Sequence, residues 1–85
     1  MSQEEKLPRI LIVEDDERLA TLTQDYLIRN GLEVGVETDG HRAIRRIIAE
    51  QPDLVVLVVM LPGADGLTVC REVRPHYNHP ILMLT

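Results

Sequence analysis

Residues 10–17 read ILIVEDDE, four aliphatic residues followed at once by four acids. The run at 10–13 is too short and too continuously apolar for an amphipathic helix, so it predicts a strand that is covered on both faces. Such strands belong to parallel sheets, in which helices connect one strand to the next. The four acids would then lie at the carboxyl end of the strand, the edge where open sheets of this class place their functional groups.

Segments of helical period and further apolar runs continue this alternation. Leu19, Leu22, Tyr26 and Leu27 recur at the spacing of one helix face, so we expect a helix that ends at Gly31 and carries Tyr26 into the core. The order β-α-β-α-β-α-β predicts a doubly wound parallel sheet with helices on both faces. The other expected elements are a strand at 32–36, a helix around 43–48 that ends at Pro52, a strand at 54–59 covered on both faces, a helix at 67–74, a loop at 75–80 and a buried strand at 81–84.

The composition limits the classes of protein. At 85 residues, with 45% apolar and 27% charged residues, the chain fits one small globular domain. A net charge of −5 and only two aromatic residues, Tyr26 and Tyr77, argue against direct binding to nucleic acid. The single cysteine, Cys70, excludes an internal disulfide framework, and the longest apolar run, residues 54–61, is too short to cross a membrane. We therefore expect a cytoplasmic protein.

Several motifs, in this order and at this spacing, resemble the receiver domain of two-component response regulators. They are ILIVEDD at residues 10–16, PDLVVL at 52–57, MLPGADG at 60–66 and ILMLT at 81–85. The run at 60–74 further resembles the OmpR-type transcription regulators, in particular their RstA-like branch. The resemblance implies a flavodoxin-like (CheY-like) sheet with strand order 2-1-3-4, in which residues 9–85 form the receiver and residues 1–8 a tail.

The resemblance also implies a function. Such a receiver accepts a phosphoryl group from a sensor histidine kinase and controls a DNA-binding output domain, without being an enzyme or binding nucleic acid or membrane itself. Glu14 and Asp15 match the acidic pair that holds Mg²⁺, with Asp15 as the more direct ligand, and the backbone carbonyl of Met60 matches a third ligand. Thr85 matches the hydroxyl residue that senses the phosphoryl group, and Pro62–Gly63 match the turn that shapes the adjoining loop.

One position departs from the family pattern. The acceptor Asp of the family stands two residues before the Met of the MLPG loop, and here that residue is Val58. Valine has no oxygen nucleophile and no metal-ligating atom, so we expect a receiver that cannot be phosphorylated in the manner of the family and binds Mg²⁺ weakly at most. A mutant chain and a naturally degenerate receiver both account for this residue.

A second departure concerns the end of the chain. The family pattern continues beyond Thr85 with further elements, and we expect an incomplete receiver whose last strand is an open edge. Exposed apolar area of this kind favours self-association or a dimer that exchanges elements between protomers.

Two other functions remain open at this point. One is a metal-dependent phosphotransferase or hydrolase that uses Glu14, Asp15 and Asp16, although no nucleophile or phosphate-binding basic group lies at a strand end. The other is a phosphate-independent dimerisation module. The basic residues Arg42, Arg45 and Arg46 are interpreted as a solvated helix face, and the acids at 14–17 have the alternative of simply starting a helix.

Overall fold

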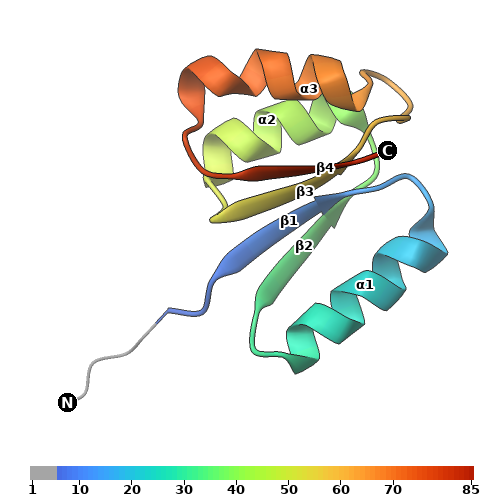
Figure 1. Ribbon diagram of the computed structural model, residues 1–85, viewed down its shortest axis with the longest axis vertical. Coiled ribbons are helices and arrows are strands. Elements are labelled where there is room, and N and C mark those ends of the chain that lie inside the picture. Colours follow the sequence, from blue (N-terminus) through green and yellow to red (C-terminus); the bar gives the residue numbers. More distant parts are fainter. Residues whose placement is uncertain (1–5) are drawn as a thin grey trace.

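The computed structural model describes residues 6–85, and its elements alternate as β-α-β-α-β-α-β (Figure 1). Residues 6–8 lead into the first strand, and the rest of the expected tail lies outside the described residues. The elements are β1 (Arg9–Val13), α1 (Glu17–Arg29), β2 (Glu33–Glu37), α2 (Gly40–Glu50), β3 (Leu54–Val58), α3 (Gly66–Val73), a 3₁₀ turn η1 (Arg74–His76) and β4 (Ile81–Leu84). The turn η1 covers the last residue of the expected helix at 67–74 and the first two residues of the expected loop at 75–80.

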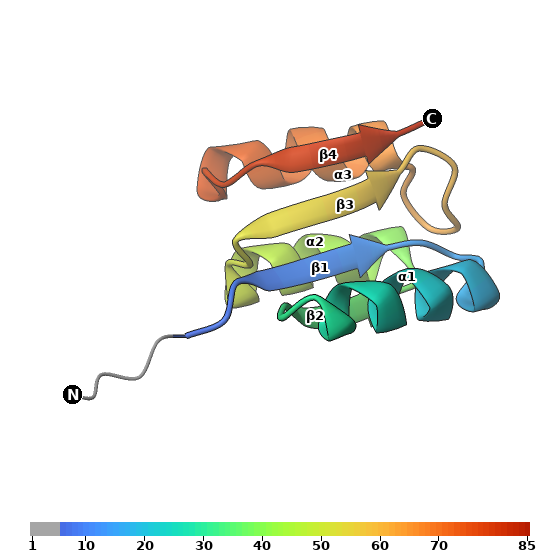
Figure 2. The same cartoon turned by 60° about the horizontal axis from the view of Figure 1, so that its bottom comes forward.

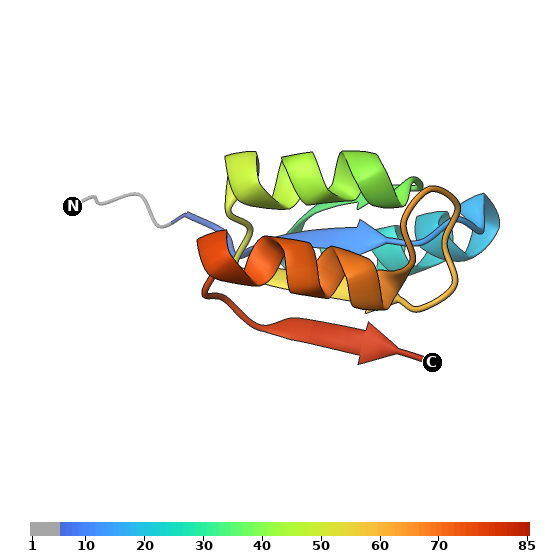
Figure 3. The ribbon, with the colours of Figure 1, turned by 90° about the horizontal axis from the view of Figure 1, so that it is seen from above.

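Within residues 6–85 the strands form one parallel sheet in the order β2-β1-β3-β4. The register pairs Val13 with Glu37 and with Leu57, and pairs Val58 with Leu84, so all four strands end at the same edge. Figure 3 shows this edge on the right, where the strands point. The flavodoxin-like fold class and the strand order are therefore confirmed.

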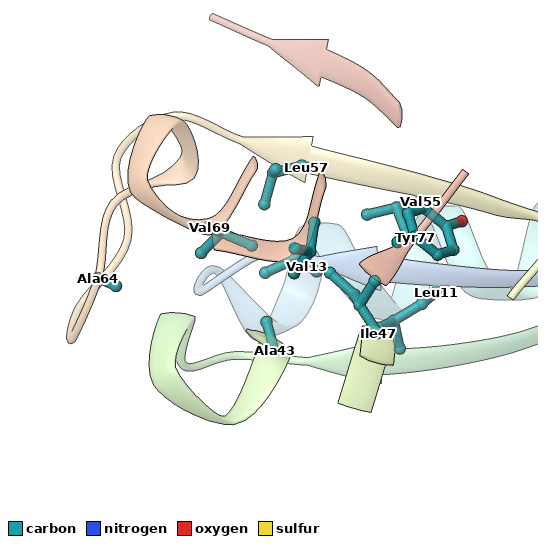
Figure 4. Packing of buried hydrophobic residues seen from close by; sticks show 10 residues of the cluster. Leu11, Val13, Ala43, Ile47, Val55, Leu57, Ala64, Val69 and Tyr77 are labelled. Carbon is teal, nitrogen blue, oxygen red and sulfur yellow. The ribbon is translucent and has the colours of Figure 1, made fainter. Parts of the chain in front are cut away.

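The core lies between the sheet and helices α2 and α3. Both helices cover the same face of the sheet, and α1 lies on the opposite face (Figures 1 and 3). Aliphatic side chains fill the space between the sheet and these two helices, together with one aromatic residue, Tyr77. The Tyr77 hydroxyl donates to the Pro52 carbonyl at 2.7 Å. Figure 4 shows the packing of this cluster of buried residues, which comprises Leu11, Val13, Ala43, Ile47, Val55, Leu57, Ala64, Val69, Val73 and Tyr77.

Each helix begins with an aspartate at the carboxyl edge of the sheet. The side chains of Asp16, Asp39 and Asp65 accept backbone N–H groups three residues later, at 2.9 to 3.1 Å. Such caps satisfy donors that the first turn of a helix leaves free. These hydrogen bonds also hold the pKa values of Asp39 and Asp65 below their usual range.

The prediction that Tyr26 lies in the core is wrong. Tyr26 is 65% exposed and Leu22 is 66% exposed, whereas the buried residue of α1 is Ala20. The helix is turned so that Gln24 reaches the sheet, where its Nε2 donates to the Val34 carbonyl at 2.9 Å. The apolar spacing marks a real helix but does not tell which side of it faces the sheet: the side of Ala20 and Gln24 does, and Leu22 and Tyr26 face outward.

The expectation of strands buried on both faces is correct for β1, in which residues 10–13 are all buried, but only in part for β3 and β4. In β3 the side chains of Val55 and Leu57 are buried, whereas the alternate residues are only half-buried. In β4, Leu82 and Leu84 are exposed. Figure 2 shows the reason: α1 lies beside β1 and β2 and leaves this face of β3 and β4 uncovered within the described residues.

Candidate functional site

The expected site residues gather at the carboxyl edge of the sheet. Glu14 directly follows β1, Val58 is the last residue of β3, and Thr85 directly follows β4. A hollow of about 430 Å³ opens between these strand ends. Its lining is Glu14, Asp15, Leu19, Val58, Val59, Met60, Leu84 and Thr85. The sequence therefore predicts correctly that the acidic pair, Val58, Met60 and Thr85 lie together, while their roles stay predictions.

The four consecutive acids divide into two pairs with different tasks. Asp16 caps α1, and Glu17 is its first residue, so these two serve the start of the helix. Glu14 is 9% exposed, and its Oε2 accepts the backbone N–H of Asp16 at 3.0 Å, whereas Asp15 is exposed at the rim of the hollow. The helix-start interpretation therefore applies to Asp16 and Glu17, whereas Glu14 and Asp15 line the hollow and their role in binding a metal stays a prediction.

Apolar side chains make up most of the remaining wall. Val58 stands beside the acidic pair and offers only hydrocarbon. Met60, 79% exposed, and Leu19, half exposed, stand at the mouth. No arginine or lysine contributes to this lining. The lining of the hollow thus combines two carboxylates with mostly apolar side chains.

The loop after β3 is fixed from the side of α2. The backbone N–H of Gly40 donates to the Pro62 carbonyl at 3.0 Å, and a Cβ on Gly40 would collide with the backbone carbonyl of Ala64. Gly63 has φ of +83° and lies against the Asp39 carboxylate. Pro62 and Gly63 do not line the hollow, and their expected role in shaping the loop that carries Met60 stays a prediction.

A buried carboxylate that the sequence interpretation missed lies next to this edge. Glu37 ends β2 and is 7% exposed. Its Oε2 accepts the backbone N–H groups of Thr38 and Asp39 at 3.1 Å and the Arg42 Nε at 2.9 Å, and Arg46 approaches its Oε1 at 3.4 Å. Arg42 and Arg45 are exposed, as a solvated face requires, although Arg42 also pairs with Glu37. Only Arg46 departs from that interpretation, because it is half-buried against β2. A glutamate five residues before an arginine gives no recognisable signal, because the pair spans a strand, a turn and a helix.

The donor set limits which metal this edge can hold. Among residues 6–85 no group of three or more His, Cys, Asp or Glu side chains is arranged to hold a metal ion. The hollow offers the carboxylates of Glu14 and Asp15 next to Met60. Mg²⁺ in proteins keeps several waters and uses one or two carboxylates, so these residues fit a largely hydrated, weak Mg²⁺ site at most.

Comparison with known families decides the identity of the fold. The family model of the response regulator receiver domain matches residues 10–85 of this chain. This chain is a receiver domain of the response regulator family. Receivers are in general signalling modules rather than enzymes; they bind Mg²⁺ at their phosphorylation site and interact with histidine kinases.

The relatives of this receiver place it near RstA of the OmpR family. The transcriptional regulatory protein RstA of Escherichia coli is 45% identical over 76 residues, which are 89% of this chain and 32% of RstA. The BeF₃-activated N-terminal receiver domain of Klebsiella pneumoniae RstA is 47% identical with a TM-score of 0.85 and is matched over 91% of this chain and 66% of its own. The receiver domain of Francisella response regulator 1452 is 27% identical with a TM-score of 0.85, covering 89% and 64%.

The receiver thus spans about a third of the length of Escherichia coli RstA. None of the helices within residues 6–85 has the length and the apolar character that crossing a membrane requires.

Proposed function

We propose that this receiver is one in which Val58 occupies the position of the phospho-acceptor, so that the chain takes no phosphoryl group from a histidine kinase. The observation that carries the proposal is the place of Val58, at the end of β3 in the same hollow as Glu14 and Asp15. Forming an acyl phosphate requires a carboxylate oxygen as nucleophile, and a valine side chain has none. On this proposal residues 9–85 are the receiver and residues 1–8 a tail.

The same substitution weakens the metal site. Glu14 and Asp15 would bind Mg²⁺ with the Met60 carbonyl, and Mg²⁺ would supply positive charge next to the edge where phosphoryl chemistry takes place in the family. One carboxylate fewer lowers the attraction for a divalent cation, and it also lowers the repulsion between the acids that remain. We therefore expect weak Mg²⁺ binding through Glu14 and Asp15.

The kinase partner would dock beside this hollow. Leu19, Leu22 and Tyr26 form an exposed apolar stripe on α1, and Leu19 also lines the hollow. An apolar stripe rimmed by polar residues is typical of a protein-binding surface. We propose that this stripe meets the histidine kinase, and that the longer protein controls transcription through a DNA-binding output domain. The receiver itself would be no enzyme and would bind neither nucleic acid nor membrane, and its cytoplasmic location stays a prediction.

Self-association is a second proposal, and a separate observation favours it. Leu82 and Leu84 are exposed, whereas Ile81 and Met83, which alternate with them along β4, pack against the core under α2 and α3. The two leucines therefore lie on the face of the sheet that also carries α1. Burying this surface against a second copy would remove apolar area from water. A hydrolase, the third alternative, has no such support, because no basic side chain in the described residues lines the hollow to bind a phosphate.

Restoring a carboxylate tests the main proposal. The chain and its Val58→Asp variant are each incubated with acetyl phosphate and Mg²⁺, and their intact masses are measured. We expect the variant to gain one phosphoryl group and the parent to gain none. Val58→Asn, which fills the same space without a carboxylate nucleophile, is the matched control and should stay unmodified.

The outcomes separate the parts of the proposal. Adding Asp15→Asn to Val58→Asp should reduce the phosphorylation, because it removes a metal-binding carboxylate and leaves the acceptor in place. Phosphorylation of the parent would overturn the proposal that it is incompetent. A Val58→Asp variant that folds and stays unmodified would overturn the assignment of Val58 to the acceptor position.

A further inference from the structure

The outer edge of β2 carries two backbone carbonyls that are each covered by a side chain. The first and last residues of β2 pair with β1: the Glu33 N–H donates to the Pro8 carbonyl at 2.9 Å, and the Glu37 carbonyl accepts the Glu14 N–H at 3.0 Å. Backbone groups alternate in direction along a strand, so those of Val34 and Val36 point away from β1. Such an edge is a template for another strand.

Side chains from both faces of the sheet reach these two carbonyls. Gln24 of α1 donates its Nε2 to the Val34 carbonyl at 2.9 Å, and Arg46 of α2 donates its NH1 to the Val36 carbonyl at 2.9 Å. Because α1 and α2 lie on opposite faces of the sheet (Figure 3), the two side chains reach the outer carbonyls of β2 from both faces.

Gly35, between the two valines, makes room for the second bond. A Cβ at this position would lie 3.1 Å from NH2 of Arg46, closer than ordinary contact. The glycine therefore lets the guanidinium lie against the strand while it also bonds to Glu50, with Nε to Oε2 at 2.9 Å. A glycine in the middle of a strand normally weakens it, and here it permits the protection of the edge.

The geometry of strand pairing indicates what the two bonds exclude. In a symmetric antiparallel pair centred on Gly35, Val34 of one chain would face Val36 of the other, and the two would exchange both N–H···O bonds. That ladder needs the carbonyls of Val34 and Val36, the same two atoms that Gln24 and Arg46 occupy.

We propose that Gln24 and Arg46 are edge-protecting residues that keep β2 from pairing with β2 of a second copy of this chain. They block both acceptors of the isologous ladder, and their removal opens an interaction surface for that one partner. The inference does not depend on the chemistry proposed for the hollow, because neither residue lines it.

The test combines Gln24→Met and Arg46→Met, which keep long unbranched side chains and remove the donors. At equal concentration, light scattering should give the double variant a higher average mass than the parent. Hydrogen exchange should show the Val34 and Val36 amides slowed about tenfold or more, since ladder bonds protect amides from exchange. Other modes of association leave these two amides unprotected.

Val36→Pro serves as the control that reverses the effect. Its missing N–H faces the outer edge, so the pairing with β1 is kept, and proline is tolerated on edge strands. Added to the double variant, it should return the mass to that of the parent. Where circular dichroism shows the double variant to be unfolded, Gln24→Met alone is measured over a concentration series with the same two readouts. A folded variant with the mass of the parent and fast exchange at Val34 and Val36 overturns the proposal.

Discussion

Glu37 is a buried acid whose charge is stabilised by neighbours from the turn and from α2. Burial alone raises the pKa of its carboxyl, but the hydrogen bonds from Arg42, the Asp39 backbone and Arg46 outweigh this effect and hold the pKa below the usual 4.5. The charged form is therefore favoured by folding, and its contribution to stability is present above the pKa of the unfolded chain. This contribution disappears as the pH falls through the lower pKa of the folded state.

Glu37→Gln should lower the free energy of unfolding at pH 7 by about 1–2 kcal/mol, because charge-assisted bonds to Arg42 and Arg46 are replaced by weaker ones. The difference between parent and variant should shrink as the pH drops below about 4.5, where the unfolded carboxyl is already protonated. Urea unfolding at a series of pH values measures this.

The matched control is Glu33→Gln, at the other end of the same strand and exposed. It should change the free energy of unfolding by less than about 0.5 kcal/mol at every pH in the series. Equal effects at the two positions would show that the hydrogen bonds and ion pairs of Glu37 do not determine its contribution to the free energy of unfolding.

At the scale of elements, local patterns predict each strand and helix, because apolar periodicity reports directly on burial. They fail on orientation. Periodicity assigns the stripe of Leu19, Leu22 and Tyr26 to the core, but these residues face outward, and Gln24 on another side of α1 bonds to β2. A side chain that reaches a backbone carbonyl on another element leaves no periodic signal. Topology places Glu14 and Asp15 at the same edge as Val58 and Thr85, so this grouping is predictable. The burial of Glu37 at the end of β2 depends instead on partners from α2 that only the fold supplies.

The contact between α2 and the loop after β3 gives a prediction at the same scale. A change from glycine to alanine within an ordinary helix stabilises the folded protein, because it reduces the conformational freedom of the unfolded chain. For Gly40→Ala we expect a loss of about 1–3 kcal/mol, because the new Cβ would collide with the Ala64 backbone and force the loop to shift. The loss is measured by urea unfolding, and amide shifts of residues 60–64 report the movement.

Gly31→Ala is the comparison for this prediction. Gly31 has φ of +86°, and no atom lies within 4 Å of the place that a Cβ would take, so the substitution costs backbone strain without a collision. This substitution should leave the amide shifts of residues 60–64 unchanged. If Gly40→Ala is as stable as the parent, the close approach of α2 and the loop does not constrain Met60.

The whole molecule has two unequal faces. On one face α2 and α3 bury an aliphatic core, and on the other α1 lies beside β1 and β2 while Leu82 and Leu84 of β4 are exposed. The sequence predicts apolar strands correctly but cannot show which alternate residues are covered, because β3 and β4 are apolar on both sides. This asymmetry, rather than any single contact, underlies the proposed self-association.

Leu82→Lys should therefore weaken self-association by at least about tenfold, equivalent to about 1.4 kcal/mol, because it places a charge in the surface that two copies would bury. Sedimentation or light scattering over a concentration series measures the shift. Leu67→Lys adds the same charge to α3, on the other face, at a residue that is also exposed, and should leave the association unchanged. Equal weakening by both would attribute the effect to net charge, and no weakening by either would exclude the face of Leu82 as the contact between copies.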